Sequence, residues 1–281
     1  MADPEADVAA PDERSRTVLL TVQYDGTDFH GWQFQPQHRT VQGELQLAVD
    51  AMFHHEIVLY GSSRTDAGVH ARALPVAFDT VRDIPLHGIL RGLNTLLPED
   101  VAVVDVQYPA PGFRPREAAV AKTYTYRYQL GDARRPLTSR FSWHVKRRRF
   151  DLEAMRAGAA LLLGEHDFSS FRATECDSRT TIRRIYGIDV TPPDAEGLIV
   201  LTVTGNAFLR NMVRIIAGTL AEVGFGRRPP AWVGEAIAAR DRREAGQTAP
   251  ACGLTLTAVH YDGYPRLGKI RRDTNAKDEG C

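Results

Sequence analysis

The sequence has few cysteines and lacks a long apolar run. Its three cysteines, Cys176, Cys252 and Cys281, are widely separated and odd in number. This excludes a disulfide framework and a cysteine zinc site, and it favours a reducing, cytoplasmic environment. No segment approaches the roughly 20 consecutive apolar residues that span a bilayer, so no membrane association is predicted. Residues 1–16 are polar and of mixed charge, which is unlike a secretion signal and predicts a disordered tail.

The motifs of common cofactor and metal enzymes are also missing. The chain contains no glycine-rich phosphate loop, no G-x-S-x-G and no H-E-x-x-H. The neighbouring histidines His54 and His55 would point to different sides of a helix end, which disfavours a shared metal ion. We therefore predict neither a metal nor a cofactor.

Positive charge is concentrated locally, although the formal net charge is zero. Residues 134–149 contain no acid, and their basic side chains are Arg134, Arg135, Arg140, Lys146, Arg147, Arg148 and Arg149. Phe141, Trp143 and His144 are interleaved with them, a mixture that suits base stacking and phosphate contact in RNA binding. The alternative is a solvated positive face with no ligand.

The hydrophobic periodicity predicts strands mixed with amphipathic helices. Strands are expected at 18–24, 56–60, 73–78, 101–106, 123–130, 181–190, 198–204 and 254–261. Helices are expected after Thr40, at 86–97, after Asp151, at 208–223 and from Pro229. A Pro/Gly-rich linker at 109–112 divides the chain into a tail at 1–16, domains at 17–110 and 111–264, and a tail at 265–281. This order predicts an α+β fold of two similar halves with mainly antiparallel sheets.

The segment 60–70 places one base and one acid, Arg64 and Asp66, among small residues between two predicted strands. It is longer than the two to five residues that a hairpin turn needs. One interpretation is a turn with a surface ion pair. The other is a catalytic carboxylate, since an ionised acid held by a cation can attack a sugar carbon. Arg210 and Arg214, four residues apart on the predicted helix 208–223, could supply a second cation or extend to solvent.

Several motifs in order resemble the tRNA pseudouridine synthase A family. The central one is Arg64-Thr65-Asp66-Ala67-Gly68-Val69-His70. Others are Tyr24-Asp25-Gly26, Gly31-Trp32-Gln33, Thr40-Val41-Gln42, Lys122-Thr123-Tyr124-Thr125-Tyr126, Gly164-Glu165-His166-Asp167-Phe168 and Asn206-Ala207-Phe208-Leu209-Arg210-Asn211-Met212-Val213-Arg214. The likeness extends from about Val18 to Tyr261, which makes chance similarity improbable.

The resemblance implies a cofactor-free and metal-free homodimer that converts uridine to pseudouridine at positions 38, 39 and 40 of the tRNA anticodon stem-loop. It implies two α+β halves around a central basic cleft, with helices on the outer faces. Asp66 would be the nucleophile, and Arg64 would help to flip the base out and then pair with Asp66. Tyr124 would stack on the uracil and is a candidate for the proton step at C5. Arg214 would be a second cation on Asp66. The implied tRNA contacts are Arg116, Arg134, Arg135, Glu175, Cys176, Asp177, Ser178 and Arg179.

Two other functions remain open on the sequence. A non-catalytic RNA-binding module would keep the basic stretch, but binding alone has no need for the set Arg64, Asp66, Tyr124 and Arg214. A glycoside or nucleoside hydrolase could use Asp66, although no second carboxylate at a matched position is evident.

Overall fold

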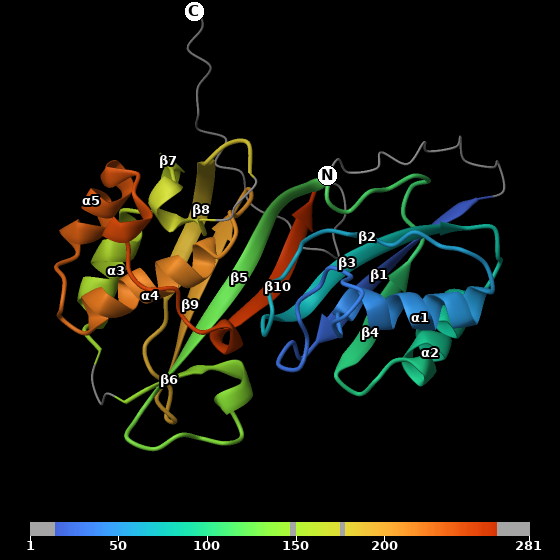
Figure 1. The fold of residues 1–281 in the computed structure, drawn as a ribbon, viewed down its shortest axis with the longest axis horizontal. Helices are drawn as coiled ribbons and strands as arrows, with labels where there is room; N and C mark the ends of the chain where they lie inside the picture. The colour runs from blue at the N-terminus through green and yellow to red at the C-terminus, as the bar shows by residue number, and fades with distance from the viewer. Residues whose placement is uncertain (1–14, 147–149, 175–177, 263–281) are drawn as a thin grey trace, which may run out of the picture.

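The computed structural model describes residues 15–146, 150–174 and 178–262, and these form one ten-stranded sheet with helices packed on it (Figure 1). The strands are β1 (Arg16–Tyr24), β2 (Tyr60–Gly61), β3 (His70–Thr80), β4 (Val101–Gln107), β5 (Ala119–Leu130), β6 (Trp143–Val145), β7 (Gly164–Asp167), β8 (Ile182–Val190), β9 (Leu198–Gly205) and β10 (Leu254–Tyr261). The helices are α1 (Val41–Phe53), α2 (Leu86–Leu96), α3 (Leu152–Ala160), α4 (Met212–Gly224) and α5 (Ala231–Ala239).

The strand order is β4-β1-β3-β10-β5-β9-β8-β7, with β2 beside β3 and β6 beside β5. The β3–β10 and β5–β6 pairs are parallel and the other pairs are antiparallel, as the predicted α+β class requires. The predicted division between residues 110 and 111 falls in the connection from β4 to β5. The domain boundaries stay a prediction, since strands from both sides of this division share the sheet.

β10 joins the two halves of the sheet. Because β3 and β10 pair only over a short stretch and then separate, the sheet opens there into a fork. β10 pairs with β5 along most of its length but with β3 at only two positions, Thr255 opposite His70 and Leu256 opposite Ala71. Farther along β3 the same edge pairs with β2, at Tyr60 opposite Ala77. The chain that enters β3 from β2 therefore passes through the fork between β3 and β10.

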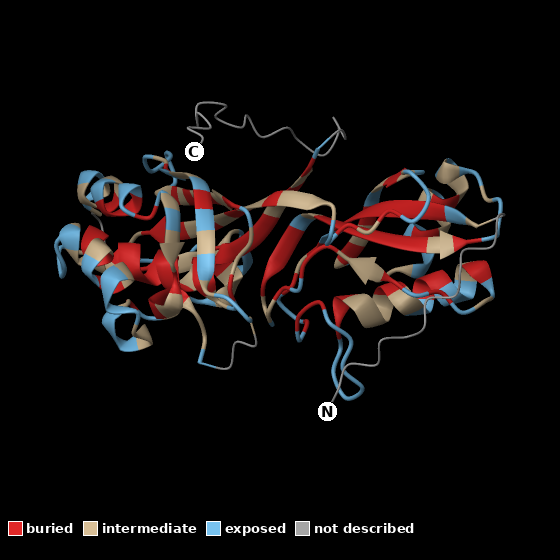
Figure 2. Ribbon diagram, turned by 90° about the horizontal axis from the view of Figure 1, so that it is seen from above, coloured by how far each residue is buried: buried red, intermediate tan, exposed pale blue. Residues whose placement is uncertain are grey.

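The core follows the alternation predicted for residues 123–130. Tyr124, Tyr126 and Tyr128 lie on one face of β5 and are buried. The Tyr128 hydroxyl donates a hydrogen bond to the Ala217 carbonyl oxygen of α4 at 2.9 Å, and the Tyr126 hydroxyl donates to the Pro250 oxygen at 2.8 Å. In Figure 2 the buried residues run through the sheet and the helix faces that pack on it.

Local capping signals were predicted correctly. Thr40 is the N-cap of α1, where its side chain accepts from the Gly43 amide at 3.2 Å. Asp151 is the N-cap of α3 and accepts from the Ala154 amide at 2.9 Å. Each side chain satisfies one of the amides that a helix start leaves unbonded.

Several predicted boundaries were wrong, and the following are examples. Residues 56–59 are not a strand, because only Tyr60 and Gly61 pair with β3. Arg16, which we placed in the tail, is the first residue of β1 and pairs with Thr80. The helix predicted at 208–223 begins only at Met212, because Asn211 has the left-handed φ of 62°. Arg210 and Arg214 therefore do not share a helical face.

The remaining tail residues, 1–14 and 263–281, are not among the described residues. In the described part of the chain, no helix combines the length and the apolar character needed to cross a membrane.

Candidate active site

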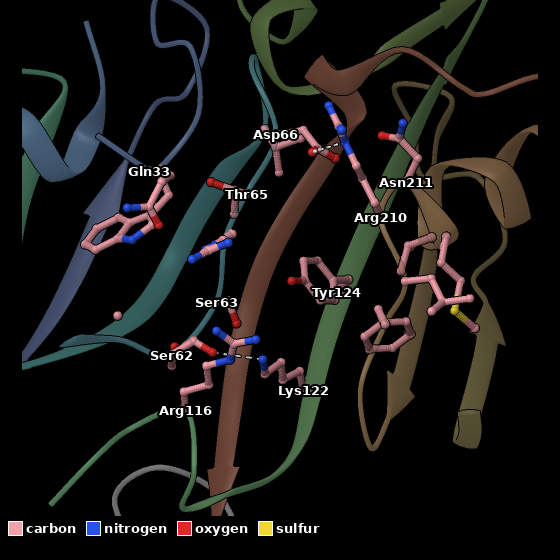
Figure 3. Close-up of a pocket in the computed structure, with 18 of the residues that line it drawn as sticks. Gln33, Ser62, Ser63, Thr65, Asp66, Arg116, Lys122, Tyr124, Arg210 and Asn211 are labelled. Carbon is pink, nitrogen blue, oxygen red and sulfur yellow. Dashed lines mark hydrogen bonds and ion pairs between the residues drawn. The ribbon is translucent and has the colours of Figure 1, made fainter. Parts of the chain in front are cut away.

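The loop from Ser62 to Val69 occupies the fork between β3 and β10 (Figure 3). The Ser62 amide donates to the Pro75 oxygen of β3 at 2.9 Å, which ties the start of the loop to one side of the fork. From the other side, Lys122 of β5 donates from Nζ to the Ser62 carbonyl oxygen at 2.9 Å. The loop is thus held between strands that come from distant parts of the sequence.

A second loop, residues 25–32, supports the first through backbone contacts. The Trp32 amide donates to the Thr65 oxygen at 3.1 Å, and the Gly68 amide donates to the Phe29 oxygen at 3.2 Å. A Cβ atom on Gly31, whose φ is +92°, would lie 2.5 Å from the Thr65 oxygen. Glycine is required there both for its φ and for the close approach of the two backbones.

A buried pair of hydroxyls fixes the residue before the candidate nucleophile. The Tyr24 and Thr65 hydroxyls form a hydrogen bond of 2.7 Å. Burial raises the pKa of Tyr24 well above its ordinary value, so its hydroxyl is neutral at physiological pH. Thr65 is held inward by this bond, whereas the Asp66 carboxylate points toward Arg210 (Figure 3).

His70 anchors the end of the same loop. The Gly26 amide donates to its Nδ1 at 3.0 Å, so the neutral ring carries its proton on Nε2, which lies 3.1 Å from the Cys252 carbonyl oxygen. Burial lowers the pKa of His70, although the Asp25 carboxylate 3.1 Å from Nδ1 opposes the shift. A neutral imidazole therefore connects the β1 turn, the start of β3 and the segment before β10.

The Asp66 carboxylate lies beside Arg210. Asp66 Oδ1 is 3.8 Å from Arg210 Nε, and the two side chains are partly exposed (Figure 3). Arg214 donates instead to the Ala249 carbonyl oxygen and to Asn211 Oδ1, at 2.8 and 2.9 Å. The left-handed Asn211 that delays α4 explains this arrangement, because it leaves Arg210 in a loop that reaches Asp66. The predicted role of Arg214 as a second cation on Asp66 stays a prediction.

Arg64 is exposed, and no ion pair joins it to Asp66 in the described parts of this structure. Its side chain lines the same cavity as the carboxylate. The interpretation of residues 60–70 as a turn with a surface Arg64–Asp66 pair therefore does not describe the structure.

Tyr124 forms one wall of the site. It is buried, and its ring meets Phe208 edge to face with the centroids 5.2 Å apart. Burial raises the pKa of Tyr124 to about 12; the nearby Ser63 hydroxyl opposes the shift and the Asp66 charge adds to it. The Ser63 hydroxyl nonetheless lacks a hydrogen bond of good geometry. Ser63 is also absent from the described non-glycine residues with positive φ, so it sits in the loop without backbone strain.

These residues surround one open cavity of about 1360 Å³. This exceeds the roughly 300–1,000 Å³ of a small-ligand pocket and suits a segment of a polymer. Its described cationic side chains are Arg64, Arg114, Arg116, Lys122, Arg179, Arg183, Arg210 and Arg214, against the carboxylates Asp66 and Glu117. A positive cleft of this kind attracts the phosphates of nucleic acid.

The predicted tRNA contacts fall into three groups. Arg116, Ser178 and Arg179 line the cavity with Asp66. Arg134 and Arg135 do not line it; they are exposed on the turn after β5, where Arg135 is 3.9 Å from Glu196. Glu175, Cys176 and Asp177 lie outside the described residues.

Part of the basic stretch makes contacts within the protein. Arg140 pairs with Asp25 and Asp28, each at 2.8 Å. Trp143, which we considered for base stacking, packs on the buried Tyr128 with ring centroids 5.9 Å apart. Both residues thus support the fold of this region.

Sequence reasoning gave no role to Lys122 and placed Arg210 on the wrong element. Lys122 belongs to the motif Lys122-Thr123-Tyr124-Thr125-Tyr126, but its burial depends on the loop that crosses above it.

In the described ranges, no three His, Cys, Asp or Glu side chains are grouped so that they could hold a metal ion.

Comparison with known proteins identifies the family of this chain. A model of the tRNA pseudouridine synthase family matches residues 20–110 and 159–262. The protein named tRNA pseudouridine synthase A in Pelobacter propionicus is 45% identical to this chain over 247 residues, which are 88% of this chain and 100% of that protein. The Geobacter sulfurreducens protein of the same name is 45% identical over 246 residues, with the same coverages. The Myxococcus xanthus protein of this name is 43% identical over 266 residues, which are 94% of this chain and 99% of that one. This chain therefore belongs to the tRNA pseudouridine synthase family.

Proposed function

We propose that this protein isomerises uridine to pseudouridine at positions 38, 39 and 40 in the anticodon stem-loop of tRNA. The observation that carries the proposal is the Asp66 carboxylate, presented by an anchored loop beside Arg210 and near Tyr124 in a large basic cavity. The names of the relatives support tRNA as the substrate. We further infer a cytoplasmic homodimer that needs no cofactor.

The first step is extrusion of the target nucleotide. A base within a stem must leave the stack before a side chain can reach its sugar or ring atoms. Arg64 is suited to fill the vacated position, because it is exposed, lines the cavity and is two residues from Asp66. The flipped uracil then stacks on Tyr124, whose ring is held by Phe208.

The chemical step breaks the bond between N1 and C1′ and forms a bond between C5 and C1′. Asp66 forms a covalent intermediate by attack on the sugar C1′ or on the base C6. On the first route the C5–C1′ bond forms as the Asp66–C1′ bond breaks, and on the second the Asp66–C6 bond breaks by elimination after C5 has joined C1′. C5 loses one proton and N1 gains one, so the reaction needs no external reactant. With a pKa near 12, Tyr124 is a neutral phenol at pH 7 and can donate a hydrogen bond or relay the C5 proton.

Arg210 and Arg214 have separate tasks in this scheme. Arg210 is the cation next to Asp66 in the free protein. Arg214 is held by Ala249 and Asn211, from where it can act as a second cation when the RNA closes the site. Arg116, Arg134, Arg135, Ser178 and Arg179, with Glu175, Cys176 and Asp177, complete the proposed tRNA contacts.

The test uses unmodified tRNA with uridines at positions 38–40, the wild-type protein, Asp66→Ala and the control Asp50→Asn. Asp50 is an exposed carboxylate on α1 outside the cavity. We expect Asp66→Ala to bind tRNA as the wild type does and to form no pseudouridine, while Asp50→Asn retains full turnover. Turnover by Asp66→Ala would refute Asp66 as the nucleophile, and wild-type binding without turnover would favour the RNA-binding module.

A further inference from the structure

Lys122 is a partly buried cation that faces the cavity. Its Nζ donates to the Ser62 carbonyl oxygen at 2.9 Å, below the loop that carries Asp66. Burial lowers the pKa of Lys122 to about 8, and the positive charge of Arg116 contributes to the shift. No carboxylate lies within 4.0 Å of its Nζ in the described residues. A neutral carbonyl leaves most of the ammonium charge uncompensated.

Arg116 brings a second positive charge to the same place. It precedes β5, lines the cavity with Lys122 and makes no ion pair within the described ranges. In Figure 3 its guanidinium and the Lys122 ammonium end close together, beneath the loop. Two cations that converge in this way repel each other, and an anion bound between them would reverse the sign of the interaction.

Ser63 adds an uncharged donor. It is buried in the loop directly after Ser62, and its hydroxyl has no hydrogen-bond partner of good geometry among the described residues. The Tyr124 hydroxyl lies nearby, so the Ser63 hydroxyl can accept from it and donate its own proton to a ligand atom. Its position on the cavity wall makes it available to the anion that Lys122 and Arg116 attract.

The short chain separation from Asp66 is compatible with a phosphate of the RNA as the anion. Ser63 and Asp66 are three residues apart, so their backbones are separated by at most about 10 Å. A nucleotide whose base lies at Asp66 and Tyr124 would place a neighbouring phosphate within this range. A phosphodiester also offers two charged oxygens to several donors at once, which matches an ammonium, a guanidinium and a hydroxyl.

We propose that Lys122, Arg116 and Ser63 form a phosphodiester-binding subsite that holds the RNA backbone next to the target nucleotide. The inference rests on the proposed function, because it takes an RNA as the substrate. Lys122 and Arg116 are positioning residues here: they fix the nucleotide so that the base enters between Asp66 and Tyr124.

The experiment replaces single phosphates and single cations together. Synthetic anticodon stem-loop RNAs carry one neutral methylphosphonate on the 5′ or the 3′ side of the target uridine. Binding and turnover are measured with the wild type, Lys122→Gln, Arg116→Gln and the control Arg91→Gln. Arg91 is exposed on α2 away from the cavity, and Arg116 is itself exposed, so neither replacement threatens the fold.

One methylphosphonate is expected to weaken wild-type binding about tenfold, and Lys122→Gln to weaken binding of the unmodified RNA by a similar factor. The two changes combined should cost little more than either alone, because both remove the same contact. The slope of log affinity against log salt should fall by about 0.7 in Lys122→Gln and stay unchanged in Arg91→Gln.

The subsite would be refuted if the loss of affinity from the methylphosphonate multiplied with the loss from the side-chain replacement, at both phosphate positions and in both Lys122→Gln and Arg116→Gln. So would an unchanged affinity in both variants. If the wild type turns over the unmodified RNA while these results are found, only the subsite fails. If the wild type neither binds nor isomerises the RNA, the proposed function fails, and the subsite fails with it.

Discussion

Replacing Lys122 by methionine is expected to make the free protein more stable at neutral pH. In the folded chain the pKa of Lys122 is about 8, against 10.5 for an unperturbed lysine. This difference corresponds to about 3 kcal/mol of destabilisation when the amine is charged in both states. Loss of the hydrogen bond to the Ser62 carbonyl offsets about 1–2 kcal/mol of the gain. The net increase in the free energy of unfolding should be about 1–2 kcal/mol at pH 7.

The pH dependence gives the sharper test. Between pH 8 and 10.5 the unfolded chain binds a proton on Lys122 that the folded chain has lost, so wild-type stability rises with pH across this window. Below pH 8 the destabilisation is fully present. The advantage of Lys122→Met over the wild type should therefore shrink by about 2 kcal/mol between pH 7 and 9.5.

Urea unfolding of the wild type and Lys122→Met at pH 7 and 9.5 measures this difference. Lys146→Met serves as the control, because Lys146 is exposed and its replacement should have the same small effect at both values. An equal effect of Lys122→Met at both pH values would refute the uncompensated charge on which the phosphodiester subsite depends.

Two further predictions concern the anchoring of the catalytic loop. Tyr24→Phe removes the buried 2.7 Å hydrogen bond to Thr65 and should lower the free energy of unfolding by about 1–2 kcal/mol. Adding Thr65→Val to this variant should then change urea unfolding little. Fully additive effects of the two replacements would contradict the pairing. His70 has a lowered pKa, so between that value and about 6.5 the unfolded chain binds the extra proton and stability falls as pH falls. Thermal unfolding from pH 7.5 to 5 should show a smaller decrease in Tm for His70→Gln than for the wild type, and parallel curves would count against the neutral imidazole.

The sequence predicted the elements whose signals are local. Thr40 and Asp151 mark helix starts through their own side chains, and the alternation of tyrosines in β5 follows from a single strand with one buried face. The strand predicted at 56–60 failed because pairing depends on a partner, and β3 offers its edge only to Tyr60 and Gly61.

The site was predictable where a motif carried it and not where packing creates it. Segment 60–70 offered Asp66 as a candidate, the family resemblance gave Asp66 and Tyr124 their roles, and both residues line one cavity. Arg210 was misplaced because periodicity continued the apolar pattern through Asn211, whose left-handed backbone delays the helix. The lowered pKa of Lys122 required knowing that a loop from the other half of the chain crosses above it.

The fork in the sheet has a consequence for the newly made protein. β10, at residues 254–261, is the strand that connects β5 to β3, so the two walls of the cavity cannot meet until these residues have left the ribosome. Until then, the β3 and β5 edges that await β10 are unpaired and open to strands of other chains. Translation that stops before Leu254 would therefore release a chain that carries Asp66 and Tyr124 but has no assembled site.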